Sequence, residues 1–377
     1  MDLSIEKANL DSTPAFIIDE NRLIKNLSDL VELKRQSGCE VLYSMKALPF
    51  GLVLKLAKKY LDGLSVSSLF EARLAKELLG DTGHIHISTP GLRDDEFNQI
   101  IELCSHISFN SICQYQRLAS FTTNHCTVGL RLNPKLSFTN DSRFDPCRPY
   151  SKLGIDIDSL DSIVDKIEGL HFHTVFSTTD YLPLVETVAL LKHKLGDKLS
   201  QLKWLNLGGG YLYSQIQNHQ PFIDLVKQLK VAYDLDVYIE PGKAIVGDAG
   251  YLVTSVIDCF TSDGKTIAVL DTSVNHNPEV FEYQRKPELL EANAVGKYSC
   301  LLVGSSCLAG DLFGEYQFES MPKLGDRLVF PNVGAYSLIK ANRFNGYNLP
   351  DIYKIDTENN LKLIKQNNYL NYREQWT

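Results

Sequence analysis

Residues 40–88 decide the fold; they read EVLYSMKALPFGLVLKLAKKYLDGLSVSSLFEARLAKELLGDTGHIHIS. Three short apolar segments have the length and composition of buried strands: Glu40–Met45, Leu64–Ser67 and His84–Ser88. Two stretches between them repeat apolar residues at helical spacing: Gly51–Tyr60 and Leu69–Leu79. Strands that alternate with single helices pair in parallel, so this stretch predicts a parallel sheet covered by helices.

The same alternation extends on both sides of this stretch. Further strands are expected at Ile107–Phe109, Thr127–Leu132, Gly169–His173, Trp204–Leu207 and Val237–Ile239. Further helices are expected at Asn21–Lys34, Asp94–Leu103, Leu160–Ile167, Leu182–Leu195 and Pro221–Leu229. About eight strand–helix units, with no G-x-G-x-x-G opening the first helix, favour a (β/α)8 barrel over an open sheet. We assign residues 21–241 to this α/β barrel.

The pattern changes after about Gly242. Strands rich in β-branched and aromatic residues, separated by Gly, Asp and Pro turns, are expected at Ile245–Ile257, Thr266–Leu270, Ser299–Val303 and Arg327–Phe330. Helical spacing is scarce here. Residues 242–377, together with 1–20, are therefore predicted to form a C-terminal all-β domain, either a β-sandwich or a β-barrel.

Composition excludes several classes of protein. The chain has 377 residues and a net charge of −8, which disfavours nucleic acid as a partner. It contains no apolar run long enough for a membrane span, and residues 1–10 lack the apolar core of a signal peptide. None of the eight cysteines forms a C-x-x-C pair, so we expect free thiols, a cytoplasmic location and no metal site.

Polar residues follow several predicted strands, where the chemistry of a barrel is found. Lys46 ends the apolar segment Tyr43–Met45. Taken alone, a lysine at such a position more often packs its aliphatic stem against the protein and leaves its amine in water. The functional alternative is a Schiff-base lysine, because burial lowers the pKa of an amine and frees its nucleophile.

Two further strand ends carry candidate cofactor groups. Gly208, Gly209 and Gly210 would let backbone N–H groups approach a phosphate, although a plain turn is nearly as common. Glu240 could pair with the protonated nitrogen of a pyridoxal ring. Lys243, three residues later, could hold an anion or be solvated.

The remaining candidates are weaker taken alone. His173 lies on the same strand face as His171 and could stack on a flat ring. Cys307 lies in the loop Gly304–Asp311 and could donate a proton, and Tyr336 could bind a phosphate. A buried Cys and a packed Tyr are the commoner cases. Together these residues supply an amine, an anion cradle, a ring-nitrogen partner, a stacking imidazole and an acid, the set that a pyridoxal phosphate enzyme needs.

The chain resembles the ornithine/diaminopimelate-type decarboxylases of the alanine racemase fold, and within them the carboxynorspermidine/carboxyspermidine decarboxylase family. The resemblance runs nearly end to end, from Thr13–Phe16 to Phe344–Pro350. The segments that carry it are Tyr43–Ala47, Gly169–His173, Leu207–Gly210, Glu240–Gly242, Gly304–Asp311 and Gly334–Ser337.

The resemblance implies roles for single residues. Lys46 would bind pyridoxal 5'-phosphate covalently, His173 would stack on its ring and Glu240 would face the ring nitrogen. Arg131 would lie near the ring, and Tyr336 would join Gly208–Gly210 at the phosphate. Cys307 would act in catalysis. The substrate would be bound by Lys243, Asp271, Glu279 and Asp311. The family also implies a homodimer, in which Cys307 and Asp311 reach a site built mainly by the other subunit.

One departure from the family leaves the substrate open. Where the subgroup has a second Glu after Glu-Pro-Gly, this chain has Lys243, which would repel the ammonium of a polyamine. The leading prediction is a decarboxylase that converts carboxynorspermidine or carboxyspermidine to norspermidine or spermidine and carbon dioxide. The alternatives are a decarboxylase of a divergent substrate, an amino acid racemase of the same fold, and a non-catalytic pyridoxal phosphate carrier.

Overall fold

The computed structural model describes residues 9–123, 125–139 and 141–377. The expectation that residues 1–10 are not a signal peptide therefore concerns residues that lie largely outside the described ones. The chain divides into two compact units. One runs from Lys25 to Ile245, and the other joins the described residues up to Ile24 with Val246–Thr377.

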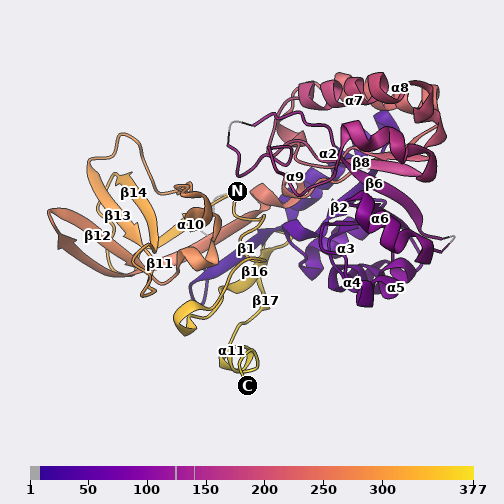
Figure 1. The fold of residues 1–377 in the computed structure, drawn as a ribbon. Helices are drawn as coiled ribbons and strands as arrows, with labels where there is room; N and C mark the ends of the chain where they lie inside the picture. The colour runs from indigo at the N-terminus through magenta and orange to yellow at the C-terminus, as the bar shows by residue number, and fades with distance from the viewer. Residues whose placement is uncertain (1–8, 124, 140) are drawn as a thin grey trace. The chain divides into compact units, whose positions relative to one another are not determined.

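The first unit is a closed parallel barrel (Figure 1). Its strands are β2 (Glu40–Ser44), β3 (Gly63–Val66), β4 (His84–Thr89), β5 (His106–Phe109), β6 (Thr127–Asn133), β8 (Gly169–Phe172), β9 (Trp204–Asn206) and β10 (Asp236–Ile239). Each pairs in parallel with its neighbours, and β10 closes the ring by pairing with β2. The short β7 (Ile155–Asp156) adds to β6. All of the expected barrel strands are present, which confirms the predicted fold class.

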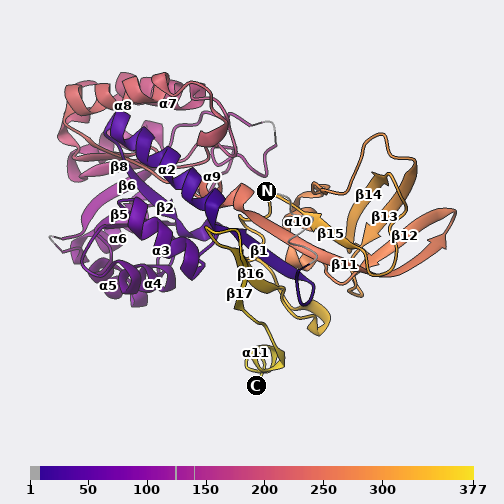
Figure 2. The ribbon, with the colours of Figure 1, turned by 180° about the vertical axis from the view of Figure 1, so that it is seen from behind.

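Helices surround this barrel (Figures 1 and 2). They are α2 (Glu20–Ser37), α3 (Gly51–Tyr60), α4 (Leu69–Leu79), α5 (Asp94–Leu103), α6 (Ile112–Leu118), α7 (Leu182–Leu195) and α8 (Gln220–Tyr233). The prediction of an α-helix at Leu160–Ile167 was wrong, because this stretch forms parts of two 3-10 segments, Ile157–Ser162 and Val164–Lys166. Helix α6, between β5 and β6, was not expected from the sequence.

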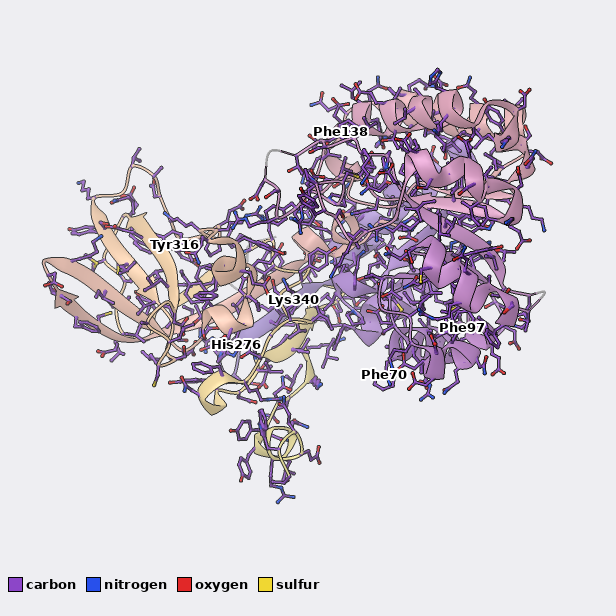
Figure 3. The ribbon with its side chains drawn as sticks, in the orientation of Figure 1. Phe70, Phe97, Phe138, His276, Tyr316 and Lys340 are labelled. Carbon is purple, nitrogen blue, oxygen red and sulfur yellow. The ribbon has the colours of Figure 1, made fainter. Side chains whose placement is uncertain are left out.

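Local signals explain where the helices begin and which face they bury. Ser68 precedes α4, and its side chain accepts a hydrogen bond from the N–H of Glu71, which satisfies a free helix donor. Phe97 of α5 is 1 % exposed, whereas Phe70 of α4 is 76 % exposed; both are labelled in Figure 3. Each helix therefore packs one apolar face against the barrel.

The second unit is a mixed sheet with the strand order β14-β13-β12-β11-β1-β16-β17, and β15 also pairs with β11. Its strands are β1 (Ala15–Asp19), β11 (Gly250–Ser262), β12 (Lys265–Leu270), β13 (Tyr298–Val303), β14 (Leu312–Phe318), β15 (Arg327–Phe330), β16 (Asp351–Ile355) and β17 (Leu361–Lys365). Strand β1 pairs antiparallel with β11 and parallel with β16. Strand β1, which precedes the barrel in the sequence, thus belongs to this sheet.

Three features of this unit differ from the sequence prediction. The strand expected to begin at Ile245 begins at Gly250, because Lys243–Val246 forms a single helical turn, α9. Strands β14, β16 and β17 were not expected. The unit also contains the short helices α10 (Glu279–Tyr283) and α11 (Tyr369–Arg373). Among the described residues, no helix combines the length and apolar character that a bilayer crossing requires.

Candidate active site

The barrel gathers the predicted residues at the carboxyl ends of its strands. Lys46 lies in the 3-10 turn Met45–Ala47, directly after β2. Arg131 lies in the last half of β6, and His173 directly follows β8. The glycine loop follows β9, and Glu240 follows β10. Because the strands are parallel, these ends meet at one rim of the barrel, the usual place for catalysis in this architecture.

A buried carboxylate lies at the centre of this group. Glu240 is 8 % exposed, and its Oε1 accepts a 2.7 Å hydrogen bond from Nδ2 of Asn206. Its Oε2 lies 3.7 Å from Nε2 of His171. The Oδ1 of Asn206 in turn accepts a 2.9 Å bond from the N–H of Gly208. Asn206 therefore fixes both the carboxylate and the glycine loop.

Sequence reasoning missed Asn206. The available signal was a polar residue inside the apolar strand Trp204–Leu207. A buried side-chain amide in such a position needs hydrogen-bond partners for its N–H groups and its oxygen, and the polar groups of an active site can supply them.

The glycine loop needs its glycines for close packing. Gly208 and Gly210 have φ of +69° and +98°, which favour glycine. A Cβ on Gly209 would lie 2.2 Å from the carbonyl oxygen of Glu240. The N–H of Gly209 donates to Nδ1 of His173 at 3.2 Å. Nδ1 of His173 is therefore the acceptor, and the neutral ring carries its proton on Nε2.

Lys46 lies in a charged and crowded environment. Burial lowers the pKa of its amine, Glu240 and Glu71 act in the opposite direction, and Arg131 lowers the pKa further. Part of its side chain is nevertheless open to water. An amine with a lowered pKa that a small molecule can approach is suited to nucleophilic attack on a carbonyl.

Glu71 is a second residue that the sequence did not single out. Its Oε2 accepts a 2.7 Å hydrogen bond from the N–H of Ser67, which directly follows β3. Burial raises the pKa of this carboxyl, whereas the Ser67 N–H and Lys46 lower it. Glu71 is thus the carboxylate that faces Lys46 from the α4 side of the rim.

The other basic groups of the rim are desolvated as well. Burial lowers the pKa of Arg131, and Glu240 opposes this shift. Burial, then Arg131 and Lys46, lower the pKa of His171 far below its ordinary value. Both ring nitrogens of His171 are buried, and neither has a hydrogen-bond partner among the residues that the structure describes. His173 is likewise kept neutral by burial and by the cations Lys46 and Arg131.

Lys243 lies at the start of α9, after the Glu-Pro-Gly turn. Its Nζ lies 5.4 Å from the centroid of the Phe176 ring, within the range of a cation–π contact. The Phe176 ring is stacked on Phe144, with centroids 4.7 Å apart. This lysine therefore places a positive charge on an aromatic surface of the barrel unit.

The β unit holds the other predicted residues in three places. Glu279 is the first residue of α10 and lies near Tyr336. Burial, then Glu279 and Tyr283, raise the pKa of Tyr336 to about 12, so the phenol keeps its proton at neutral pH. Figure 3 labels Lys340, which forms an ion pair with Glu282 of the same helix.

The Cys307 loop is built around Asp311, which is 2 % exposed. Its Oδ1 accepts a 2.8 Å bond from the N–H of Val274, and its Oδ2 accepts a 3.1 Å bond from the N–H of Ser306. The Cys307 N–H donates to Oδ1 of Asn345 at 2.8 Å. The Cys307 side chain itself is exposed. Asp311 therefore shapes the loop that presents the thiol.

Asp271 is occupied elsewhere. Its Oδ1 accepts from Oγ1 of Thr254 at 2.6 Å and from the N–H of Ser255 at 2.9 Å, and its Oδ2 accepts from Thr13. Both oxygens thus hold β11 and the segment before β1 together. These contacts favour a structural role over the substrate-binding role expected from the sequence.

Comparison with known proteins gives the family. Residues 16–334 match the family described as pyridoxal-dependent decarboxylase, C-terminal sheet domain. The chain belongs to the pyridoxal-dependent decarboxylases. This finding confirms the predicted family and its cofactor, pyridoxal 5'-phosphate.

Three relatives show how far the similarity extends. The carboxynorspermidine/carboxyspermidine decarboxylase of Campylobacter jejuni is 35 % identical, over 96 % of this chain and 97 % of the relative. The carboxyaminopropylagmatine decarboxylase of Synechocystis is 33 % identical, over 98 % of this chain and 97 % of the relative. The crystal structure of the Campylobacter jejuni carboxynorspermidine decarboxylase with norspermidine has a TM-score of 0.87 and 33 % identity, and the match covers 97 % of this chain and 100 % of that one.

The rim of this decarboxylase fits its cofactor. Lys46 offers an amine with a lowered pKa, and Glu240 offers a buried carboxylate for a ring nitrogen. His171 presents a buried imidazole whose nitrogens make no hydrogen bond with the described residues, and Arg131 adds a desolvated cation. The Gly208–Gly210 loop brings backbone N–H groups to the same rim. These groups match the amine, cation, anion and imidazole that pyridoxal phosphate needs.

Proposed function

We propose that this decarboxylase acts on a carboxylated polyamine, such as carboxynorspermidine or carboxyspermidine, and releases norspermidine or spermidine and carbon dioxide. The observation that supports it most strongly is 35 % identity to the Campylobacter jejuni enzyme over nearly the whole of both chains. The Synechocystis relative, named for a carboxylated agmatine derivative, points to the same class of substrate.

The barrel residues have the following roles in this proposal. When bound, the cofactor supplies a protonated ring that accepts the electron pair left on Cα as carbon dioxide departs. Glu240 keeps the proton on the ring nitrogen, and Asn206 holds the carboxylate in place through its 2.7 Å bond. His173 would face the cofactor as a neutral ring, since a charged one would repel a cationic ring. Lys46 would hold the cofactor through its amine.

The β unit supplies the remaining groups. We infer that the enzyme is a cytoplasmic homodimer and that Cys307 and Asp311 act at the site of the partner chain. The exposed thiol of Cys307 is available to donate a proton to Cα, and Asp311 holds its loop. Glu279 and Tyr336 lie close enough for their charges to interact, which suits paired roles toward substrate and phosphate.

Lys243 supports a second candidate function. A cation at the rim is unfavourable for the ammonium groups of a polyamine and favourable for a substrate with an anionic or neutral tail. Its position over Phe176 places the charge on a surface that could otherwise bind a substrate cation. A decarboxylase of the same fold with such a substrate is therefore the alternative.

A substrate panel tests the proposal. The holoenzyme is incubated with carboxynorspermidine, carboxyspermidine, carboxyaminopropylagmatine, diaminopimelate, ornithine, lysine and arginine, and product masses are measured. Turnover of a carboxylated polyamine supports the proposal. Bound cofactor with turnover of none of them contradicts it and favours the alternative. In that case Lys243→Glu should create activity on a carboxylated polyamine if Lys243 is the residue that excludes it.

A further inference from the structure

Three histidines meet inside the barrel at the end opposite the active site. His84 and His106 are the first residues of β4 and β5, and His86 lies two positions after His84. His86 pairs in register with His106, so the three side chains share the inner face of adjacent strands. One nitrogen of each imidazole lies within 4.8 Å of the others.

One nitrogen of each imidazole has a polar partner within the protein. Nε2 of His84 pairs with Glu40 at 3.1 Å, and Nδ1 of His106 pairs with Oγ of Ser105 at 2.9 Å. Nδ1 of His86 lies 3.4 Å from Nδ2 of Asn206. Nε2 of His86, a residue 4 % exposed, is buried and has no hydrogen-bond partner among the described residues. This is the pattern of metal-ligating histidines, whose second nitrogen is held by an outer group.

We propose that His84, His86 and His106 bind a divalent transition-metal ion, with Zn²⁺ as the best match. Three imidazoles suit zinc, and a fourth position would be open to water. The zinc geometry requires ligand nitrogens about 3.3 Å apart, so the side chains must draw together slightly. The rings of His86 and His106 are stacked with centroids 3.8 Å apart, and one of them must turn about its Cβ–Cγ bond.

The surroundings suit a cation that enters from the surface. Three carboxylates have favourable electrostatic interactions with a cation at His84: Glu40, Asp62 and Asp236. Glu168 has the same effect at His106. Lys34 and Lys230 interact with Glu40 and partly offset this negative charge. His84 also lines a surface pocket together with Asp62 and Thr82, which provides a path for the ion. The spacing of these histidines along the sequence follows no zinc motif, so only the barrel brings them together.

Binding changes one contact. A metal on Nε2 of His86 places the ring proton on Nδ1, which can then no longer accept from Asn206. The 3.4 Å contact between them would be lost, and the 2.7 Å bond from Asn206 to Glu240 would remain. The site is therefore structural in character, with Asn206 as its connection to the active site.

A cobalt titration tests the proposal. Tag-free holoenzyme is treated with a chelator, dialysed and titrated with Co²⁺, and visible absorption, bound metal by mass spectrometry and melting temperature are followed. We expect one Co²⁺ per chain, displaced by Zn²⁺, with a raised melting temperature. His84→Ala, chosen because His84 is partly exposed, and His106→Gln should each lose this ion, whereas His193→Ala, on the exposed face of α7, should keep it.

Two results would overturn it. One is wild-type holoenzyme without a stoichiometric Co²⁺ ion. The other is an ion that persists unchanged in both His84→Ala and His106→Gln. Circular dichroism of the variants in chelator shows whether they fold, so a loss of metal that is caused by unfolding is recognised. If His84→Ala does not fold, His84→Asn, which keeps a polar group beside Glu40, replaces it in the titration.

Discussion

Lys46 is the residue on which most of the proposed chemistry depends, because it combines a lowered pKa with access for a small molecule. Lys46→Ala should bring turnover to background and remove the visible absorption of the lysine-bound cofactor. Lys55→Ala, on the exposed side of α3, is the matched control and should behave as wild type. A normal rate in Lys46→Ala would show that another amine holds the cofactor.

Asn206 is predicted to act through Glu240. Asn206→Leu keeps much of the volume but removes the 2.7 Å bond to the buried carboxylate and the 2.9 Å bond from Gly208. A lost hydrogen bond to a charged group costs about 1.5–3 kcal/mol, so both the free energy of unfolding and the affinity for cofactor should fall. Urea titration and cofactor titration measure the two quantities. Cofactor affinity equal to wild type would assign Asn206 a purely structural role.

At the scale of elements, the glycine loop makes a sharp prediction. A Cβ at Gly209 meets the Glu240 carbonyl oxygen at 2.2 Å, so Gly209→Ala must move the loop or the turn after β10. Cofactor affinity should fall strongly. Gly51→Ala is the control, since its Cβ meets nothing within 4 Å at the start of α3. Equal cofactor affinity in the two variants would mean that the loop does not bind the phosphate.

The regular elements were the easiest to predict. Helices α3, α4, α5 and α7 begin and end where apolar spacing places them, because each buries one face against the barrel. The stretch Leu160–Ile167 has similar spacing, yet its residues pack as 3-10 turns. Strand β17 was missed because four of its five residues are exposed, and it therefore lacks the apolar alternation of a half-buried strand.

The site was predicted only in part. Strand ends pointed to Lys46, His173 and Glu240, since parallel strands place their carboxyl ends at one rim. Asn206 was missed because its charged partner, Glu240, lies 34 residues away in the sequence. Asp271 was assigned to substrate, although its contacts with Thr13 and Thr254 cannot be deduced from spacing.

For the whole molecule, the inferred shared site can be tested by complementation. Lys46→Ala and Cys307→Ala should each be inactive. If each site takes Lys46 from one chain and Cys307 from the other, random mixing after mild unfolding restores about a quarter of wild-type activity, because half the dimers are mixed and each has one intact site. No recovery, with mixed dimers demonstrated by differential tags, would place both residues at a site within one chain.

Acid should destabilise the molecule in part through His276. Burial lowers the pKa of this imidazole to about 4, although Asp311 opposes the shift, and Nδ1 pairs with Thr272 at 2.9 Å. The unfolded ring accepts a proton near pH 6.5, so its contribution is complete above that pH and falls by on the order of 3 kcal/mol toward pH 4. The difference in unfolding free energy between wild type and His276→Gln should therefore shrink with acidity. A difference independent of pH would contradict the lowered pKa.

The position of β1 between β11 and β16 has a consequence for synthesis on the ribosome. The barrel segment, Lys25–Ile245, is contiguous and can form as soon as it emerges. Strand β1 leaves the exit tunnel before the barrel, yet its parallel neighbour is translated more than three hundred residues later. Until then this strand, which is buried along its whole length in the finished sheet, has an unpaired edge that attracts other strands. We therefore expect chains that stop between the barrel and β16 to depend on chaperones, and to aggregate even though they contain the complete barrel.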